Sequence, residues 1–312
     1  MGTEYHISWV SKHSTSQDLK KERSTIQQGV NAHLKAINKS MSTYDTSSEL
    51  SLLNKNFTQG WQDISIDLYR VLMMSQQVNV QSLGAFDVTV GPLVNLWGFG
   101  PSKSKDQVPN AKDIGRIREK VGAEALTLRM RDESFQLALT APRYIDLSAI
   151  AKGYAVDVLG RYLQRQGIDR YLVEVGGEII AHGKKDIDSP WRIAIEAPSD
   201  QGRNAQIIIP LNNLGIATSG DYRNFFEQDG ERYSHTIDGR TGYPVKHNLA
   251  SVSVLHSSVA MADAWATALT VAGVEAGLEI AEKNELAAYF IVRTPEGFEQ
   301  YTSRQFEQLI LD

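Results

Sequence analysis

The sequence predicts an α+β protein, in which mainly antiparallel sheets are flanked by helices. Two observations predict this class: the strand-like runs come in clusters instead of alternating one by one with helices, and 42% of the 312 residues are hydrophobic while 22% are charged, as in an ordinary globular protein. A chain of this length forms one large domain or two ordinary ones of about 150 residues. We expect a single domain over residues 1–312, built from two packed subdomains, with a loop near 101–110, where a polar segment contains two prolines.

Helical periodicity dominates the first half of the chain. Alternating apolar residues at 5–9 predict an opening strand. Apolar residues then recur at helical spacing and predict one face of a long amphipathic helix: Leu19, Ile26, Val30, Leu34, Ile37 and Met41. We expect a second helix from Ser65 to near Gly84, and a short third one around 114–121 that ends at Gly122.

Short strands prevail from Ala125 onward. The runs that read as strands are 126–128, 135–137, 144–147, 171–175, 191–196, 206–211, 214–218, 223–227, 232–237 and 251–256. Asp229-Gly230 lies between two of these runs and predicts a hairpin turn. One helix is expected from about Ile150 to Gln166 and another from about Ser258. A helix–strand–strand–helix pattern closes the chain.

Composition and charge exclude several classes of protein. The formal net charge of −5 argues against a nucleic-acid partner, since such proteins usually carry a strongly basic domain. The absence of cysteine excludes thiolate nucleophiles, cysteine metal sites and disulfides. The longest apolar stretch, 249–273, is interrupted by His256 and Asp263, so we expect no transmembrane span. Neither a GxGxxG nor a P-loop motif is present.

Three polar segments could carry chemistry. Asp263 and Thr267 are four residues apart on a predicted helix and share one face. Their hard oxygen atoms suit Mg²⁺, although a buried Asp bonded to a Thr hydroxyl would look the same. His235 ends a predicted hairpin strand, where it is either a general base or a surface residue beside a turn. Lys152 lies near a predicted helix N-terminus, which favours phosphate; alternatively Asp146 or Ser148 merely caps that helix.

Glycines and aromatic residues add weaker signals. Glycines at Gly84, Gly176-Gly177 and Gly220 allow the backbone to approach a ligand closely, or simply form turns. A flat aromatic ligand would need rings to stack on, although rings at such spacings also fit a core. The candidate rings are Tyr44, Phe86, Trp97 and Phe99.

Taken together and in this order, the segments resemble the FAD:protein FMN transferase (ApbE) family. The resemblance covers almost the whole chain, and its number of short motifs makes chance agreement implausible. The matching motifs are Met1-Gly2-Thr3, 41–44, 48–50 with Asn54, 84–93, 96–100, 146–148, 151–154, 175–177, 218–220, 234–238, and 262–264 with Thr267.

The resemblance implies an ApbE-like, T-fold-like architecture and an activity. Members of the family split FAD in the presence of Mg²⁺, pass FMN to a Thr or Ser hydroxyl of an acceptor protein and release AMP. The acceptors are subunits of Na⁺-pumping NADH:quinone reductase and of Rnf-type complexes. Two other activities remain open: an FAD pyrophosphatase, in which water replaces the acceptor hydroxyl, and a non-catalytic FAD-binding carrier. A soluble α+β domain without these activities is the least favoured alternative.

The resemblance also assigns roles to individual residues. It implies that Asp263, Thr267 and the backbone carbonyl of Ala149 bind Mg²⁺, and that His235 is the catalytic base. The residues that it implies line the FAD site are Met1, Tyr44, Ala85, Phe86, Asp87, Asp146, Lys152 and Ile237. On these roles, Asp263→Ala should abolish Mg²⁺-dependent turnover and leave the fold largely intact.

Location follows from the resemblance alone. It implies the periplasmic side of the inner membrane, and we expect that a lipoprotein signal with its anchoring Cys has been removed ahead of Met1.

Overall fold

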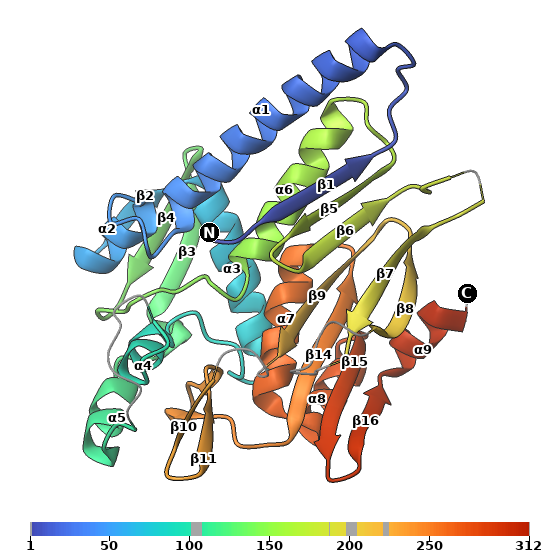
Figure 1. Cartoon of the computed structure of the whole chain (residues 1–312). Coiled ribbons are helices and arrows are strands. Elements are labelled where there is room, and N and C mark those ends of the chain that lie inside the picture. Colours follow the sequence, from blue (N-terminus) through green and yellow to red (C-terminus); the bar gives the residue numbers. More distant parts are fainter. Residues whose placement is uncertain (1, 101–107, 187, 198–204, 221–224, 312) are drawn as a thin grey trace.

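The computed structural model describes residues 2–100, 108–186, 188–197, 205–220 and 225–311. Within this part of the chain, seven strands form one large sheet in the order β1-β5-β6-β9-β14-β15-β16 (Figure 1). Each pair of neighbours is antiparallel, so the predicted class is confirmed. The strands are β1 (Tyr5–Trp9), β5 (Tyr171–Val175), β6 (Glu178–His182), β9 (Leu214–Gly220), β14 (Leu249–His256), β15 (Ala287–Thr294) and β16 (Gly297–Thr302).

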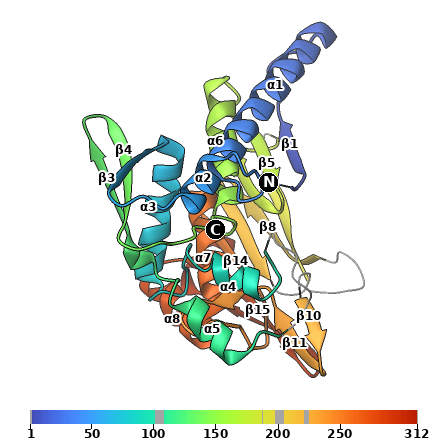
Figure 2. The ribbon, with the colours of Figure 1, turned by 90° about the vertical axis from the view of Figure 1, so that its left-hand side faces the viewer.

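The centre of the large sheet is buried on both faces. Helices α6 (Ala151–Arg165), α7 (Val259–Ala272) and α8 (Val274–Lys283) cover one face, as Figures 1 and 2 show. The other face packs against the β7 (Trp191–Glu196)–β8 (Ala205–Leu211) hairpin and α9 (Arg304–Leu311). Successive residues of β14 therefore enter different cores: Val254 packs in the cluster that contains Trp265, and Leu255 in the one that contains Phe306. Burial on both faces explains why β14 reads as almost continuously apolar.

Two long helices form an outer layer on this helical face. Helix α1 (Ser16–Met41) packs against α6, and α3 (Ile66–Gln81) packs against α7. The predicted apolar face of α1 is buried at Ile26, Val30, Ile37 and Met41. Leu19 was expected on the same face but is exposed, because the first turns of α1 extend beyond the rest of the molecule (Figure 2).

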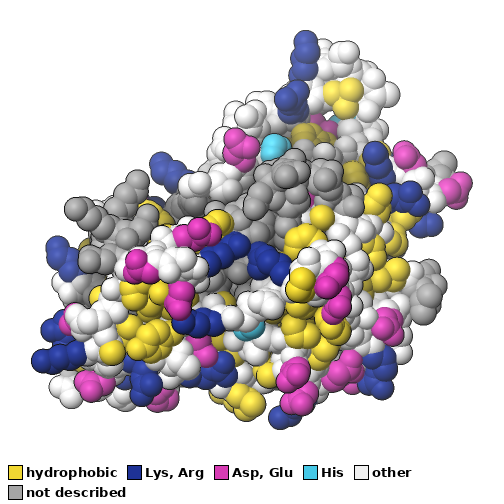
Figure 3. Space-filling view, turned by 60° about the horizontal axis from the view of Figure 1, so that its bottom comes forward, with side chains coloured by type: hydrophobic (Ala, Val, Ile, Leu, Met, Phe, Trp, Pro, Cys, Tyr) yellow, Lys and Arg dark blue, Asp and Glu magenta, His cyan; other side chains and the backbone are white. Residues whose placement is uncertain are grey.

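Smaller elements surround the main sheet. A three-stranded sheet has the order β2 (Trp61–Ile64), β4 (Ser134–Leu139), β3 (Leu126–Arg131). The remaining elements are α2 (Glu49–Lys55), α4 (Gly91–Leu96), α5 (Ala111–Arg118), β10 (Phe225–Gln228), β11 (Glu231–Ser234), β12 (Ile237–Asp238) and β13 (Tyr243–Pro244). Figure 3 shows acidic and basic side chains interspersed with hydrophobic ones on the end of the molecule that carries β10, β11 and α5.

The predicted turn at Asp229-Gly230 is confirmed. It joins β10 to β11 with positive φ angles of 54° and 79°, as a tight hairpin turn requires. The expected strand over 232–237 is divided, because β11 ends at Ser234 and β12 begins at Ile237. The expected strand at 223–227 is described only from Phe225 onward, and residues 101–107 of the expected loop lie outside the described residues.

The strand predicted at 144–147 is wrong. The side-chain amide of Asn54 takes the place of a neighbouring strand there: Ile145 N donates to Asn54 Oδ1 (2.7 Å), and Asn54 Nδ2 donates to Ile145 O (2.8 Å). Asp146 N donates to the carbonyl of Val88 at 2.7 Å. Ile145 and Asp146 are therefore hydrogen-bonded to other segments without belonging to a sheet.

Several short elements were missed, namely α2, β2, α4, β6 and β13. The single-domain assignment of residues 1–312 stays a prediction. Among the described residues, no helix has the length and apolar character needed to span a membrane.

Candidate functional site

A cavity of about 390 Å³ opens where the N-terminus of α6, one side of α7, the end of β9 and the loops after α3 and β11 meet. It brings together predicted site residues from distant parts of the chain. Those that line it are Tyr44, Ala85, Phe86, Asp87, Asp146, Ala149, Lys152, His235, Ile237, Asp263 and Thr267. Met1, also predicted to contact FAD, lies outside the described residues.

The N-terminus of α6 is capped from another helix. Asp263, on α7, accepts a hydrogen bond from Gly153 N through Oδ2 at 3.1 Å. The alternative in which Asp146 or Ser148 caps this helix is wrong: no side chain in the described N-cap region caps α6, and Asp146 Oδ1 accepts the Ser148 amide (2.9 Å) in a local turn. The sequence suggested capping residues adjacent to the helix. The carboxylate that caps α6 instead belongs to Asp263, 110 residues after Gly153 in the chain.

The capping is reciprocal. Asp157, on α6, caps the N-terminus of α7 by accepting from Ser258 Oγ (2.7 Å), Val259 N (2.8 Å) and Ala260 N (3.1 Å). Burial raises the pKa of Asp157, and this effect is larger than that of the three hydrogen bonds, which lower the pKa. The helices approach so closely that a Cβ at Gly153 would lie 2.2 Å from the Val259 carbonyl oxygen. The two helices that carry the candidate site are thus locked together at their N-termini.

Lys152 occupies the first turn of α6, where the helix dipole also favours an anion. Its ammonium hydrogen-bonds to Glu178 and lies 3.5 Å from Asp263 Oδ1. Burial opposes the charge on Lys152, but the negative charges of Asp263 and Glu178 outweigh it and raise the lysine pKa. Burial and the charge of Asp263 raise the pKa of Glu178 despite its bond to Lys152. Lys152 is therefore a permanent positive charge on the cavity wall.

Sequence reasoning missed Glu178. It directly follows the Gly176-Gly177 turn between β5 and β6, and its side chain is only 3% exposed. The glycine pair was recognised as a turn, and its positive φ angles of 61° and 101° confirm that. An acidic residue immediately after such a turn was the available signal, but its burial depends on packing against α6.

Three oxygen donors in the cavity suit a hard cation. Asp263 and Thr267 lie one helical turn apart on α7, as predicted, and Ala149 lines the same cavity. In a continuous helix the Gly153 amide would donate to Ala149 O; in the described structure it donates to Asp263, which leaves that carbonyl available. The described residues contain no group of three or more His, Cys, Asp or Glu side chains that could hold a metal ion. A site with one carboxylate fits Mg²⁺, which keeps most of its positions for water and substrate phosphate.

Two side chains of the loop after α3 that line the cavity are hydrogen-bonded or buried. Asp87 Oδ1 accepts from Thr89 N (2.7 Å) and Thr89 Oγ1 (2.6 Å), while its Oδ2 accepts from Ala123 N (3.1 Å). Burial raises the pKa of Asp87 against these bonds. Phe86 packs in the main core and is 2% exposed. The Asp87 carboxylate therefore holds the loop in shape, and the Phe86 ring offers little surface for stacking.

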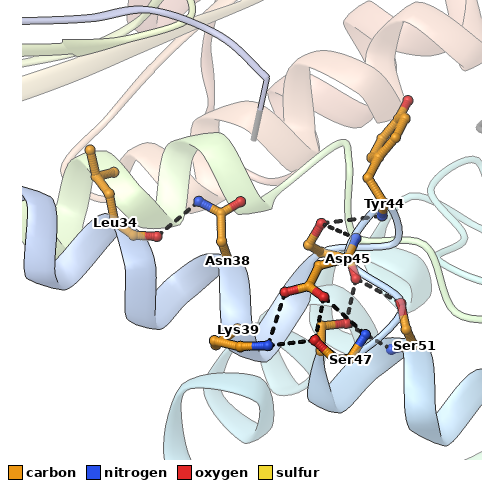
Figure 4. Close-up of polar contacts among 9 residues, drawn as sticks. Leu34, Asn38, Lys39, Tyr44, Asp45, Ser47 and Ser51 are labelled. Atoms are coloured by element: carbon orange, nitrogen blue, oxygen red, sulfur yellow. Dashed lines mark hydrogen bonds and ion pairs between the residues drawn. The ribbon is translucent and has the colours of Figure 1, made fainter.

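Tyr44 stands on a tight turn between α1 and α2 (Figure 4). Ser42 Oγ accepts from the backbone amides of Tyr44 (3.2 Å) and Asp45 (3.1 Å). Hydrogen bonds from Ser47, together with Lys39, lower the pKa of Asp45 to about 2, so this anchor is ionised at neutral pH. The Tyr44 ring is 71% exposed and points away from the turn, which presents it at the rim of the cavity.

His235 lies directly after β11, on the cavity wall. Its ring meets that of Phe99 edge-on, with centroids 6.3 Å apart, and Phe99 in turn packs against Phe226. Trp97 is buried and donates from Nε1 to Gly242 O at 3.0 Å. Of the four candidate rings, Tyr44 and Phe99 therefore offer surface to the cavity, while Trp97 belongs to the core like Phe86.

Comparison with known proteins decides the family. The sequence profile of the ApbE family matches residues 1–290. The chain belongs to the ApbE family. The resemblance found in the sequence is therefore confirmed.

Relatives of the family match over nearly the full length. A curated protein from Haemophilus influenzae, named FAD:protein FMN transferase, is 43% identical over 312 residues, which cover 99% of this chain and 89% of the relative. The apo crystal structure of the flavinyl transferase ApbE from Pseudomonas stutzeri has a TM-score of 0.87 at 38% identity, and the match covers 98% of this chain and 93% of that one. The flavin transferase ApbE from Vibrio cholerae also has a TM-score of 0.87, at 42% identity, with 99% and 96% covered.

Proposed function

We propose that this chain transfers FMN from FAD to a Thr or Ser hydroxyl of an acceptor protein, with Mg²⁺ and with release of AMP. Its ApbE relatives named FAD:protein FMN transferase support an enzyme that transfers FMN from FAD. The observation that carries the finer steps is the meeting, in one cavity, of Lys152, the α6 N-terminus, the oxygen donors of α7 and His235.

The cavity wall is suited to holding a pyrophosphate. Lys152 and the N-terminal end of the α6 dipole place positive charge on the cavity wall, which suits the two phosphates of FAD. Asp263, Thr267 and the Ala149 carbonyl would hold Mg²⁺ beside them. When bound, Mg²⁺ supplies Lewis acidity that neutralises charge developing on the phosphate oxygens.

His235 is suited to accepting the proton of the incoming hydroxyl. A Thr or Ser hydroxyl is a weak nucleophile near neutral pH, so removal of its proton by a neighbouring base assists attack. The acceptor oxygen forms a bond to the phosphorus of the FMN half, and the bond from that phosphorus to the oxygen bridging to the AMP half breaks. The proton goes to His235 and AMP leaves, so the FMN remains as a phosphoester on the acceptor.

The acceptor and the cellular location rest on the family resemblance alone. We propose as acceptors subunits of Na⁺-pumping NADH:quinone reductase or Rnf type. For the location we propose the periplasmic side of the inner membrane.

The test combines the full chain with FAD, Mg²⁺ and an acceptor subunit. We expect flavin fluorescence on the acceptor band of a denaturing gel and an equal amount of AMP, both abolished by EDTA. An acceptor whose target Thr is replaced by Val is the matched control and should stay unlabelled. AMP with free FMN and no labelled acceptor would identify a pyrophosphatase instead. FAD that binds but remains intact would identify a carrier and refute the role of His235.

A further inference from the structure

The carboxylate of Asp263 takes part in three interactions. It caps α6 through Oδ2, it lies 3.5 Å from the ammonium of Lys152 through Oδ1, and in the proposed function it also binds the cation. An ammonium that is fully paired with Asp263 would compete with a divalent cation for the same oxygen. Something must therefore keep Lys152 from becoming the permanent partner of Asp263.

Glu178 is placed to do this. It reaches Lys152 from β6, and it makes the shorter of the two ion pairs with that ammonium. Its side chain is 3% exposed, and within the described part of the chain its Oε2 has no hydrogen-bond partner. Burial of an incompletely bonded carboxylate is a poor way to stabilise a fold, since an apolar residue usually serves as well or better. The geometry thus favours a role in function.

We propose that Glu178 is a positioning residue: by holding Lys152 it leaves Asp263 Oδ1 to the divalent cation. The inference deepens the proposed function and rests on its cation site. In the cation-bound protein, Glu178 is the counterion that keeps Lys152 at the cavity wall. When Glu178 is replaced, Asp263 is the carboxylate that remains beside the Lys152 ammonium. The cation must then displace this ammonium from Asp263 in order to bind.

The test is a four-member cycle in the full chain, measured by Mn²⁺ binding without turnover. The proteins are the wild type, Glu178→Gln, Lys152→Met and the double variant, with free Mn²⁺ followed by electron paramagnetic resonance. Gln keeps the shape and a hydrogen-bond acceptor, so the melting temperature should stay near that of the wild type. We expect Glu178→Gln to raise the Mn²⁺ dissociation constant about fivefold or more when Lys152 is present. In the Lys152→Met background the same substitution should change it less than twofold.

A second expectation follows for catalysis. In Glu178→Gln the Mg²⁺ concentration that gives half-maximal AMP release should rise, while excess Mg²⁺ should restore turnover. The matched control is Glu174→Gln in the same hairpin, because Glu174 accepts from Gly177 N (2.8 Å) and pairs with His6 instead of Lys152. Its Mn²⁺ affinity should equal that of the wild type.

Three results would overturn the inference. The first is that Glu178→Gln weakens Mn²⁺ binding equally in the presence of Lys152 and in the Lys152→Met background. Glu178 would then act on the cation directly, through its negative charge or as a ligand, and not through Lys152. An unchanged dissociation constant in Glu178→Gln would remove its role altogether. Failure of the wild-type protein to bind Mn²⁺ would remove the cation site, whereas Mn²⁺ binding without acceptor labelling would refute the transferase and leave the inference standing.

Discussion

Asp263 combines a structural role and a proposed catalytic role, and two substitutions separate them. Asparagine keeps an oxygen that can accept the Gly153 amide but removes the charge; alanine removes both. Asp263→Asn should therefore change the free energy of unfolding by less than about 1 kcal/mol. Asp263→Ala removes an N-cap and leaves a buried amide unbonded, which should cost about 1–2 kcal/mol. Asp263→Ala should therefore leave the fold largely intact, as expected from the sequence, but loosen the N-terminus of α6.

Both variants should lose Mg²⁺-dependent turnover alike. Removal of the one carboxylate among the proposed cation donors should lower AMP release by about 10²-fold or more. Urea unfolding measures the stability difference, and AMP release from FAD across a Mg²⁺ titration measures catalysis. Wild-type turnover in Asp263→Asn would refute the cation site. Equal stability of the Asn and Ala variants would refute the capping role.

Three further predictions test the site and its support. His235→Gln should lower acceptor labelling by about 10²-fold or more while FAD binding, followed by flavin fluorescence, stays unchanged; undiminished labelling would exclude this base. Asp157→Asn places an amide against three donors that cap α7 and should cost about 2–4 kcal/mol in urea unfolding, whereas a loss under 1 kcal/mol would contradict the cap. Burial lowers the pKa of His256, whose Nδ1 accepts from Ser258 N at 2.9 Å. As the pH falls, this imidazole is therefore protonated in the unfolded chain before it is protonated in the folded one, and the free energy of unfolding should decrease below about pH 6.5. His256→Gln should flatten that part of the pH profile of the urea midpoint, and an unchanged slope would count against it.

Elements with a strong local period were predictable. The buried stripe of α1 from Ile26 to Met41 and the hairpin turn at Asp229-Gly230 follow from side-chain spacing and turn chemistry, which act between near neighbours. The segment at 144–147 failed for the opposite reason. Its apolar and polar residues alternate as in a strand, but Ile145 is hydrogen-bonded to the side chain of Asn54 instead of to a neighbouring strand. A partner so distant in the chain leaves no trace in the local pattern.

The candidate site divides in the same way. Spacing and motifs were enough to predict that Asp263 and Thr267 share a helix face, that Lys152 lies in the first turn of a helix, and which family the chain resembles. The caps that Asp263 and Asp157 supply to α6 and α7, and the burial of Glu178 against Lys152, became visible only in the folded chain. The physical reason is distance along the chain: spacing fixes which residues share one element, whereas a cap or a counterion from another element depends on how two helices and a strand pack.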